Sequence, residues 1–372
     1  MMLSTEHKIL ASAANLDPDE DDLQKIRGYM STVIDTNHLI DLAVREGLAG
    51  FLYKSLLKAG LLETLNPHHK QKLYESYYIT IRHNLKLIHA LIEILKPLVQ
   101  KQIQVILMQG ISLLQQVYRD IGLRPMTDID LWALPTHYSD LVDCLVNQGF
   151  KCHPLYPHTF KKGEVVLDIH THILGGDRIK SRDVLINIGQ EEIFKEARPI
   201  NVENSTALCL NPSDQFLYLS LHALKHNLER LIWLVDLKSL VAEWELSDWK
   251  ALKIRAEQLG QQAALFYMLF ALTKIFHITL PAEISSYLEG WKPNLFERRV
   301  LNRRINGNPI PTWCQLVLIS AGKGLRERLS FVRETLFPRP KILRQVFPNS
   351  SSLSDGQLYW KRVLQILGSL NT

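Results

Sequence analysis

The stretch from Val105 to Asp168 constrains the fold of this 372-residue chain most, because two apolar runs within it carry aspartates. The first run, TDIDLW at 127–132, places Asp128 and Asp130 two residues apart. In a β-strand, residues i and i+2 point to the same face, about 7 Å apart along the chain. The spacing therefore predicts a strand on which two carboxylates converge on one spot.

A second strand-like run, VVLDIH at 165–170, contains Asp168 as a lone acid among apolar residues. If the two runs pair in one sheet, three carboxylates meet. Carboxylates about 5 Å apart repel by roughly 3 kcal/mol per pair at an effective dielectric constant near 20, which favours a bound divalent cation or a raised pKa. Oxygen ligands alone suit Mg²⁺ or Mn²⁺.

Upstream, an apolar run over 103–108 is followed by Gly110, and the sequence ISLLQQVY from 111 onward has a helical pattern. Glycine lets a ligand approach the backbone closely, and the free N–H groups of a helix N-terminus attract anions. With the hydroxyl of Ser112, this turn is a candidate phosphate cradle. An ordinary turn between a strand and a helix is the alternative, because such turns commonly carry glycine.

The order of these features resembles the polymerase-β-type nucleotidyltransferase superfamily. Several segments, spread over about residues 40–240, narrow the resemblance to its poorly characterised bacterial nucleotidyltransferase family. They are QGISLL at 109–114, YRDIGLRPMTDIDLW at 118–132, LVNQGF at 145–150, LDIH at 167–170 and HALKHNLERLIWLVD at 222–236.

The resemblance implies an enzyme that uses a nucleoside triphosphate (NTP) as co-substrate and moves a nucleotidyl group to an acceptor hydroxyl or phosphate, releasing pyrophosphate. The resemblance implies that the catalytic residues, which also bind Mg²⁺ (or Mn²⁺), are Asp128, Asp130 and Asp168. It implies nucleotide binding by Gln109, Gly110, Ser112 and Arg124. The acceptor is an unknown small molecule, peptide or protein, and the residues expected to bind it are His170, His222, Lys225, His226 and Arg230.

Gln109 departs from the family pattern, which carries lysine before the glycine. Loss of a cation beside the phosphates would weaken triphosphate binding or change the donor. Two alternatives therefore stay open: a degenerate nucleotide-binding or partner-binding protein without turnover, and a transferase that uses another nucleotide-activated donor, such as a sugar nucleotide.

The segment 222–236 has histidines at helical spacing. His222, His226 and Arg230 are four residues apart, which predicts one stripe along a helix. The resemblance implies that this stripe faces the active cleft. Asp236 is predicted to pair with Arg230.

Charge, cysteine content and the length of the apolar runs exclude several classes of partner, metal site and location. The formal net charge of +5 is mild, so nucleic acid is an unlikely partner. The four cysteines contain no Cys-x-x-Cys pair, so neither a disulfide framework nor a zinc site is indicated. The chain start lacks a signal-peptide pattern and no apolar run is long enough to span a bilayer, so we expect a cytoplasmic protein.

The hydrophobic pattern predicts an α+β protein, with a small β-sheet flanked by N-terminal helices and a C-terminal helical domain. The resemblance implies that this sheet is mixed and has polymerase-β-type nucleotidyltransferase topology. The expected domains are a helical region over 1–100 with a long brace helix at 67–98, a catalytic core over 101–210 and a helical domain over 211–372. Strands are expected at 103–108, 127–134, 150–153, 164–171 and 206–210. Helices are expected at 111–120, 136–148, 212–227, 229–246, 248–259 and 261–277.

The segment 323–345 is the most basic part of the chain, with seven Lys and Arg against two Glu. Binding of nucleic acid or a membrane is one interpretation. Because Leu325, Leu329, Val332 and Leu336 recur at helical spacing, a solvated amphipathic helix is the preferred one.

Overall fold

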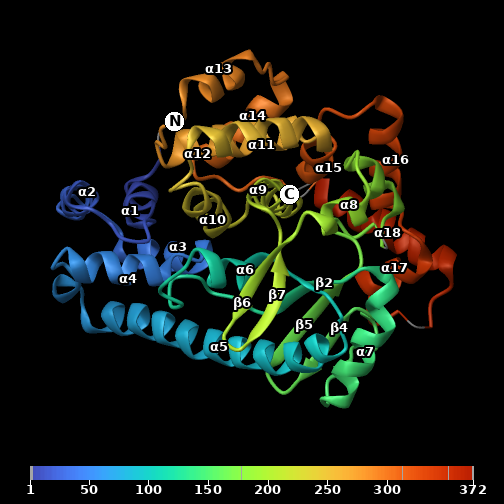
Figure 1. The fold of residues 1–372 in the computed structure, drawn as a ribbon. Helices are drawn as coiled ribbons and strands as arrows, with labels where there is room; N and C mark the ends of the chain where they lie inside the picture. Colours follow the sequence, from blue (N-terminus) through green and yellow to red (C-terminus); the bar gives the residue numbers. More distant parts are fainter. Residues whose placement is uncertain (1–2, 177, 312, 351, 371–372) are drawn as a thin grey trace.

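A computed structural model describes residues 3–176, 178–311, 313–350 and 352–370. It confirms an α+β protein that is mostly helical, with one mixed sheet and helical flanks (Figure 1). Within the described residues, seven strands lie in the order β3-β4-β5-β2-β1-β7-β6. Their bounds are β1 (Ile106–Leu107), β2 (Ile129–Trp132), β3 (Lys151–Cys152), β4 (Thr159–Lys162), β5 (Val165–His170), β6 (Arg198–Val202) and β7 (Ser205–Cys209).

Alternation along the two central strands separates a core face from a polar face. Ile129 and Leu131 on β2, with their register partners Leu167 and Ile169 on β5, are buried in the cluster formed with the helices beneath the sheet. The residues between them, among them Asp130, point to the opposite face. The same alternation that builds the core thus places the acids on the other side.

The core face is covered by α7 (Tyr138–Asn147) and the C-terminal part of α5 (Pro67–Gln100), and Figure 1 shows α5 continuing from the sheet to a position under α4. α5 begins with the Asn66 side chain accepting from the N–H of His69. The predicted brace helix is confirmed and continues through Pro97. Proline cannot bond the carbonyl of Glu93 four residues earlier, and Gln148 Nε2 donates to that carbonyl instead, at 2.6 Å.

The other described helices pack around this centre in three groups. The N-terminal group is α1 (Thr5–Ala13), α2 (Glu20–Met30), α3 (Thr36–Glu46), α4 (Ala49–Lys58) and η1 (Leu62–Thr64). Between the strands lie α6 (Gln109–Gln116), η2 (Pro135–His137), η3 (Lys180–Leu185) and α8 (Gln190–Lys195). The C-terminal group is α9 (Pro212–Lys225), α10 (Ile232–Leu240), α11 (Leu246–Leu259), α12 (Gln262–Ile275), α13 (Ala282–Gly290), α14 (Leu295–Ile305), α15 (Cys314–Ile319), α16 (Leu325–Leu336), α17 (Pro340–Val346) and α18 (Asp355–Leu370).

Two strands have no counterpart in the predicted pattern. β4 reads TFKK, and β6 begins with Arg198 and Pro199 and alternates only at Ile200 and Val202, so the apolar pattern of each is too short to predict a strand. β6 is an edge strand, where proline is tolerated because one side of its backbone has no partner. The neighbouring strands, not local sequence preference, hold both in the sheet.

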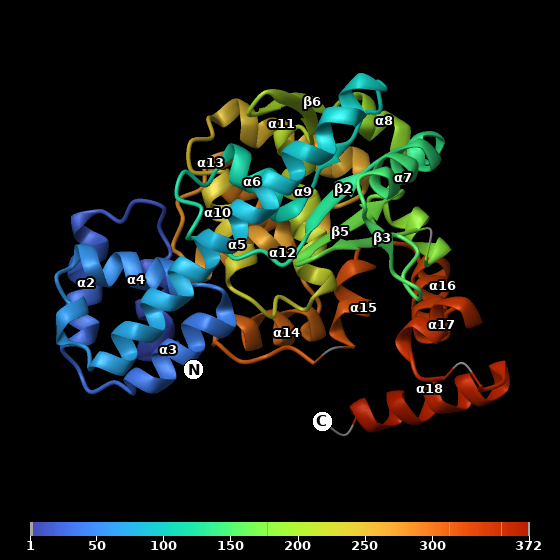
Figure 2. The same cartoon turned by 90° about the horizontal axis from the view of Figure 1, so that it is seen from below.

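The basic segment 323–345 is divided between α16 and α17, and Figure 2 shows both beside the β3 edge of the sheet. Along the predicted apolar stripe, Leu325 and Leu329 are 74% and 61% exposed, whereas Val332 and Leu336 are partly buried against the core. The first part of the segment is therefore a largely solvated helix, as the preferred interpretation has it, but only the second half of its apolar stripe packs on the protein. In the described part of the chain, no helix combines the length and apolar character needed to cross a bilayer.

Candidate active site

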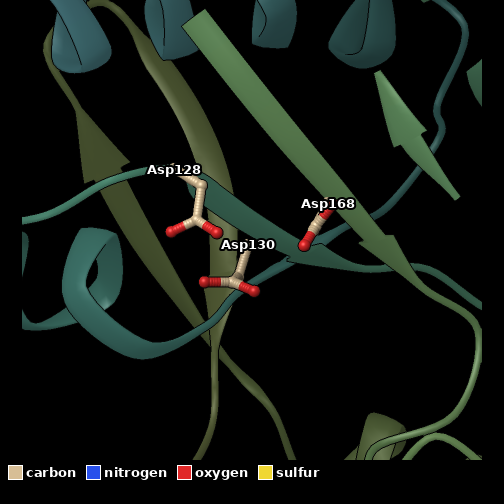
Figure 3. A group of neighbouring side chains, drawn as sticks. All are labelled: Asp128, Asp130 and Asp168. Carbon is tan, nitrogen blue, oxygen red and sulfur yellow. The ribbon is translucent and has the colours of Figure 1, made fainter. Parts of the chain in front are cut away.

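The three predicted acids meet on the polar face of the sheet. Asp130 of β2 and Asp168 of β5 are register partners in parallel strands, and Asp128 lies one residue before β2. One carboxylate oxygen from each lies within 4.8 Å of the others, and Figure 3 shows the three side chains turned toward one another.

This crowding changes the acidity of the cluster. Burial and the neighbouring charge of Asp130 raise the pKa of Asp128 to about 6, although Thr127 Oγ1 donates a hydrogen bond to it. His170 Nε2 donates to Asp130 Oδ1 at 2.8 Å. Burial opposes the charged imidazole, but the hydrogen bond and the charge of Asp130 outweigh it, so the pKa of His170 is raised.

The donor set fits a hard divalent cation. Asp168 Oδ1 is buried and, within the described structure, has no hydrogen-bond partner. Oxygen ligands about 2.1 Å from an octahedral Mg²⁺ lie about 3 to 4 Å from one another, slightly closer than the 4.8 Å limit of this cluster. A small inward shift of the side chains would complete such a site, with His170 orienting Asp130 from behind.

The predicted phosphate turn lies after β1, at the start of α6. Gln109 adopts a left-handed φ of +50°, and its side chain hydrogen-bonds Tyr218 of α9. At Gly110 a Cβ atom would lie 2.8 Å from the Met126 side chain, so close packing alone explains this glycine. Ser112 is 2% exposed and its hydroxyl accepts from Gln116 Nε2 at 2.7 Å. Phosphate contact by these residues stays a prediction.

Arg124 lies behind this turn rather than facing the acids. Its Nε and Nη2 donate to both oxygens of Asp236 at 2.8 to 3.1 Å, and Nη1 donates to the Pro125 carbonyl. Tyr118 donates to the same carboxylate at 2.7 Å. The predicted pairing of Asp236 with Arg230 is therefore wrong. Contact of Arg124 with phosphate would require this buried pair to open.

The predicted stripe of His222, His226 and Arg230 is interrupted. α9 ends at Lys225, and Asn227 and Leu228 adopt left-handed φ values of +53°. Arg230 consequently leaves the stripe, and its guanidinium lies against Gly47 in the N-terminal region. The rings of His222 and His226 remain 4.7 Å apart. Burial and Lys225 lower the pKa of His226 to about 4, and burial with its neighbour His226 lowers that of His222.

A cavity of about 260 Å³ opens beside Asp168. Its lining includes five site residues predicted from the sequence: Gln109, Asp168, His170, His222 and Lys225. It also includes residues that were not predicted as site residues: Tyr218, Arg178, Arg182, Arg339 and Lys341. The basic composition of 323–345 was a signal for the last two, but no spacing connected them with the aspartates.

Residues 32–277 match the profile of the family described as uncharacterised nucleotidyltransferases. The chain belongs to this family. Membership in the uncharacterised nucleotidyltransferase family implies a transferase that acts on a nucleotide substrate, which agrees with the buried acidic triad. A comparison with curated proteins finds no match.

Proposed function

We propose that this protein transfers a nucleotidyl group from an NTP to a hydroxyl or phosphate oxygen of an acceptor, in a reaction that depends on Mg²⁺ or Mn²⁺. The observation that supports it is the convergence of Asp128, Asp130 and Asp168, with a buried Asp168 oxygen that has no partner within the described structure. Three carboxylates this close are costly without a cation.

In the proposed reaction, Asp128 and Asp130 would hold two Mg²⁺ ions, and Asp168 would be a ligand of the second ion. Bound Mg²⁺ neutralises charge on the triphosphate and lowers the pKa of an attacking hydroxyl. The acceptor oxygen forms a bond to the α-phosphorus while the bond from that phosphorus to the bridging oxygen breaks, and pyrophosphate leaves. Where the acceptor is a hydroxyl, Asp168 accepts its proton.

The surrounding residues position the reactants. His170 orients Asp130 through its 2.8 Å hydrogen bond. The backbone N–H groups at the start of α6 are the proposed contacts for the β- and γ-phosphates, because they are not used within the helix and lie at its positive end. Gln109 borders this turn and supplies a neutral amide where the family has a cation.

The test is thermal unfolding with ATP, GTP, CTP, UTP or a sugar nucleotide, each with and without Mg²⁺. A ligand at about 100 times its dissociation constant stabilises the fold by about 2.7 kcal/mol. We compare the wild type with Asp128→Asn/Asp130→Asn. The matched control is Asp140→Asn/Asp143→Asn, which removes the same charge from exposed positions on α7.

We expect one nucleoside triphosphate to stabilise the wild type and the control variant only when Mg²⁺ is present, and not to stabilise Asp128→Asn/Asp130→Asn. If only the sugar nucleotide stabilises the protein, the donor substrate is a sugar nucleotide and not an NTP. If the double variant is folded and at least as stable as the wild type without ligand, and no nucleotide stabilises either protein, the proposal is wrong.

A further inference from the structure

The cavity beside Asp168 has a strongly cationic wall. Among its described lining residues Asp168 is the sole acid, whereas five residues carry Lys or Arg side chains. Arg178 and Arg182 follow β5, Lys225 ends α9, and Arg339 and Lys341 lie at the start of α17. Three parts of the chain that are distant in sequence thus bring positive charge to one space.

Hydrogen bonds hold this wall together. Arg178 Nη2 donates to Gln345 Oε1 at 2.9 Å, and Arg339 Nη2 donates to the Arg178 carbonyl at 3.3 Å. Tyr156 donates to the Gln345 carbonyl at 3.0 Å, which ties α17 to the loop before β4. These bonds keep Arg178 and Arg339 next to each other although their charges repel, which is expected where an anion binds between them.

The position of the wall relative to the triad decides which reactant it serves. The phosphate turn follows β1 on one side of β2, whereas β5 and β4 lie on the other side. The cavity lies mainly on that second side, since its lining includes Asp168 of β5 and Thr159 of β4, and it extends as far as Gln109 at the start of the turn. In phosphoryl-type displacement the attacking and leaving oxygens lie roughly in line on opposite sides of the phosphorus. With pyrophosphate leaving toward the turn, the acceptor enters from the cavity.

We propose that the acceptor carries an anionic group, a phosphate or a carboxylate, which Arg178, Arg182, Lys225 and Arg339 bind in this cavity. The inference rests on the proposed nucleotidyl transfer. Guanidinium groups recognise both anions through paired N–H donors. A space of about 260 Å³ suits a small molecule or the terminal group of a larger one. Arg339 and Lys341 lie after residue 277, beyond the family match, so this part of acceptor recognition belongs to the C-terminal segment.

Isothermal titration calorimetry with two probes tests the proposal: phenyl phosphate, a phosphate monoester, and succinate, a dicarboxylate. The main variant is Arg178→Gln/Arg339→Gln. A second variant, Arg339→Gln/Lys341→Gln, keeps the bond between Arg178 and Gln345. The matched control is Lys180→Gln/Arg333→Gln, which removes two exposed cations near the cavity that do not line it.

We expect one probe to bind the wild type and to bind at least tenfold more weakly to both cavity variants, with the control unchanged. The probe that binds identifies the anion. Binding should persist when the non-hydrolysable α,β-methylene ATP and Mg²⁺ are present, because donor and acceptor occupy different sides of the triad. Displacement of the probe by the nucleotide would overturn the inference, because these basic residues would then bind the triphosphate and not the acceptor.

The Asp128→Asn/Asp130→Asn variant separates this inference from the proposed function. It should still bind the probe after losing nucleotide. A wild type that binds probe but no nucleotide contradicts nucleotidyl transfer and leaves the anion site intact. A wild type that binds nucleotide with Mg²⁺ but neither probe contradicts the anionic acceptor alone.

Discussion

Asp130 and Asp168 occupy the same register position on neighbouring parallel strands. Backbone hydrogen bonds in the sheet, and not a loop, therefore set the separation of the two carboxylates. The core residues Ile129, Leu131, Leu167 and Ile169 on the reverse face fix the same register, because a slip by one residue would bury the acids. The site is rigid before any ligand arrives.

Asp128→Asn should stabilise the metal-free protein. Burial and the charge of Asp130 raise the pKa of Asp128 to about 6, so its ionised form is disfavoured in the folded state at neutral pH. Removing that charge should raise the free energy of unfolding at pH 7.5 by about 1 to 3 kcal/mol, measured by urea titration in EDTA. Asp143→Asn on α7 is the control. An Asp128→Asn protein that is no more stable than the control would contradict the crowding described for the triad.

Breaking the pair between Arg124 and Asp236 should destabilise the fold strongly. Their side chains are 8% and 0% exposed, so either single variant, Arg124→Met or Asp236→Ala, leaves a buried charge without its partner. We expect a loss of about 3 to 5 kcal/mol for each in urea unfolding. The double variant should lose clearly less than the sum, because it leaves neither charge. Additive losses would show that the two side chains do not act as a pair.

Stability should fall in acid partly through His226. Its pKa is about 4 in the folded state, against about 6.5 for an unfolded chain. Between these values the unfolded state binds more protons, so stability is lost as the pH falls from 6.5 toward 4. Between pH 7.5 and pH 5 the wild type should lose about 1 to 2 kcal/mol more than His226→Gln.

Urea unfolding at both pH values measures this difference. His38→Gln, at an exposed position on α3, is the control and should lose as much stability as the wild type. If His226→Gln also lost as much, the histidine would not be the titrating group.

Gln109→Lys should tighten nucleotide binding. The new cation would lie at the start of α6, beside the proposed position of the β- and γ-phosphates, and its attraction is reduced by its own loss of hydration. We expect about tenfold higher affinity for ATP with Mg²⁺, measured by calorimetry at low salt. Gln71→Lys adds the same charge at an exposed position on α5 and should change little. Equal affinity of wild type and Gln109→Lys would place the phosphates elsewhere.

The parts of the fold that could be predicted from the sequence are those encoded by local periodicity. β2 and β5 alternate apolar and polar residues, and α5 carries a long apolar stripe, so each element is visible on its own. β4 and β6 lack such a pattern and exist because a neighbouring strand pairs with them.

The candidate site divides in the same way. Asp128 and Asp130 could be predicted from one short run. Arg178 and Arg339 are 161 residues apart and have no shared motif, so only the folded chain brings them together. The prediction for Arg230 is wrong for a local reason. It assumes that helical spacing continues through Asn227 and Leu228, but these two residues have left-handed φ values, so the helix ends before them. Two such residues in succession are rare and cannot be read from periodicity.

The pair of Arg124 with Asp236 also has a consequence during synthesis on the ribosome. The two residues are 112 positions apart, so at typical translation rates of about 5 to 20 residues per second the arginine emerges roughly 6 to 22 s before its partner. During that time the turn in front of it lacks the support of this buried ion pair, although β1, α6 and β2 have all been made. The strands that carry the proposed catalytic acids are thus synthesised before Asp236, and the ion pair that supports their surroundings forms only afterwards.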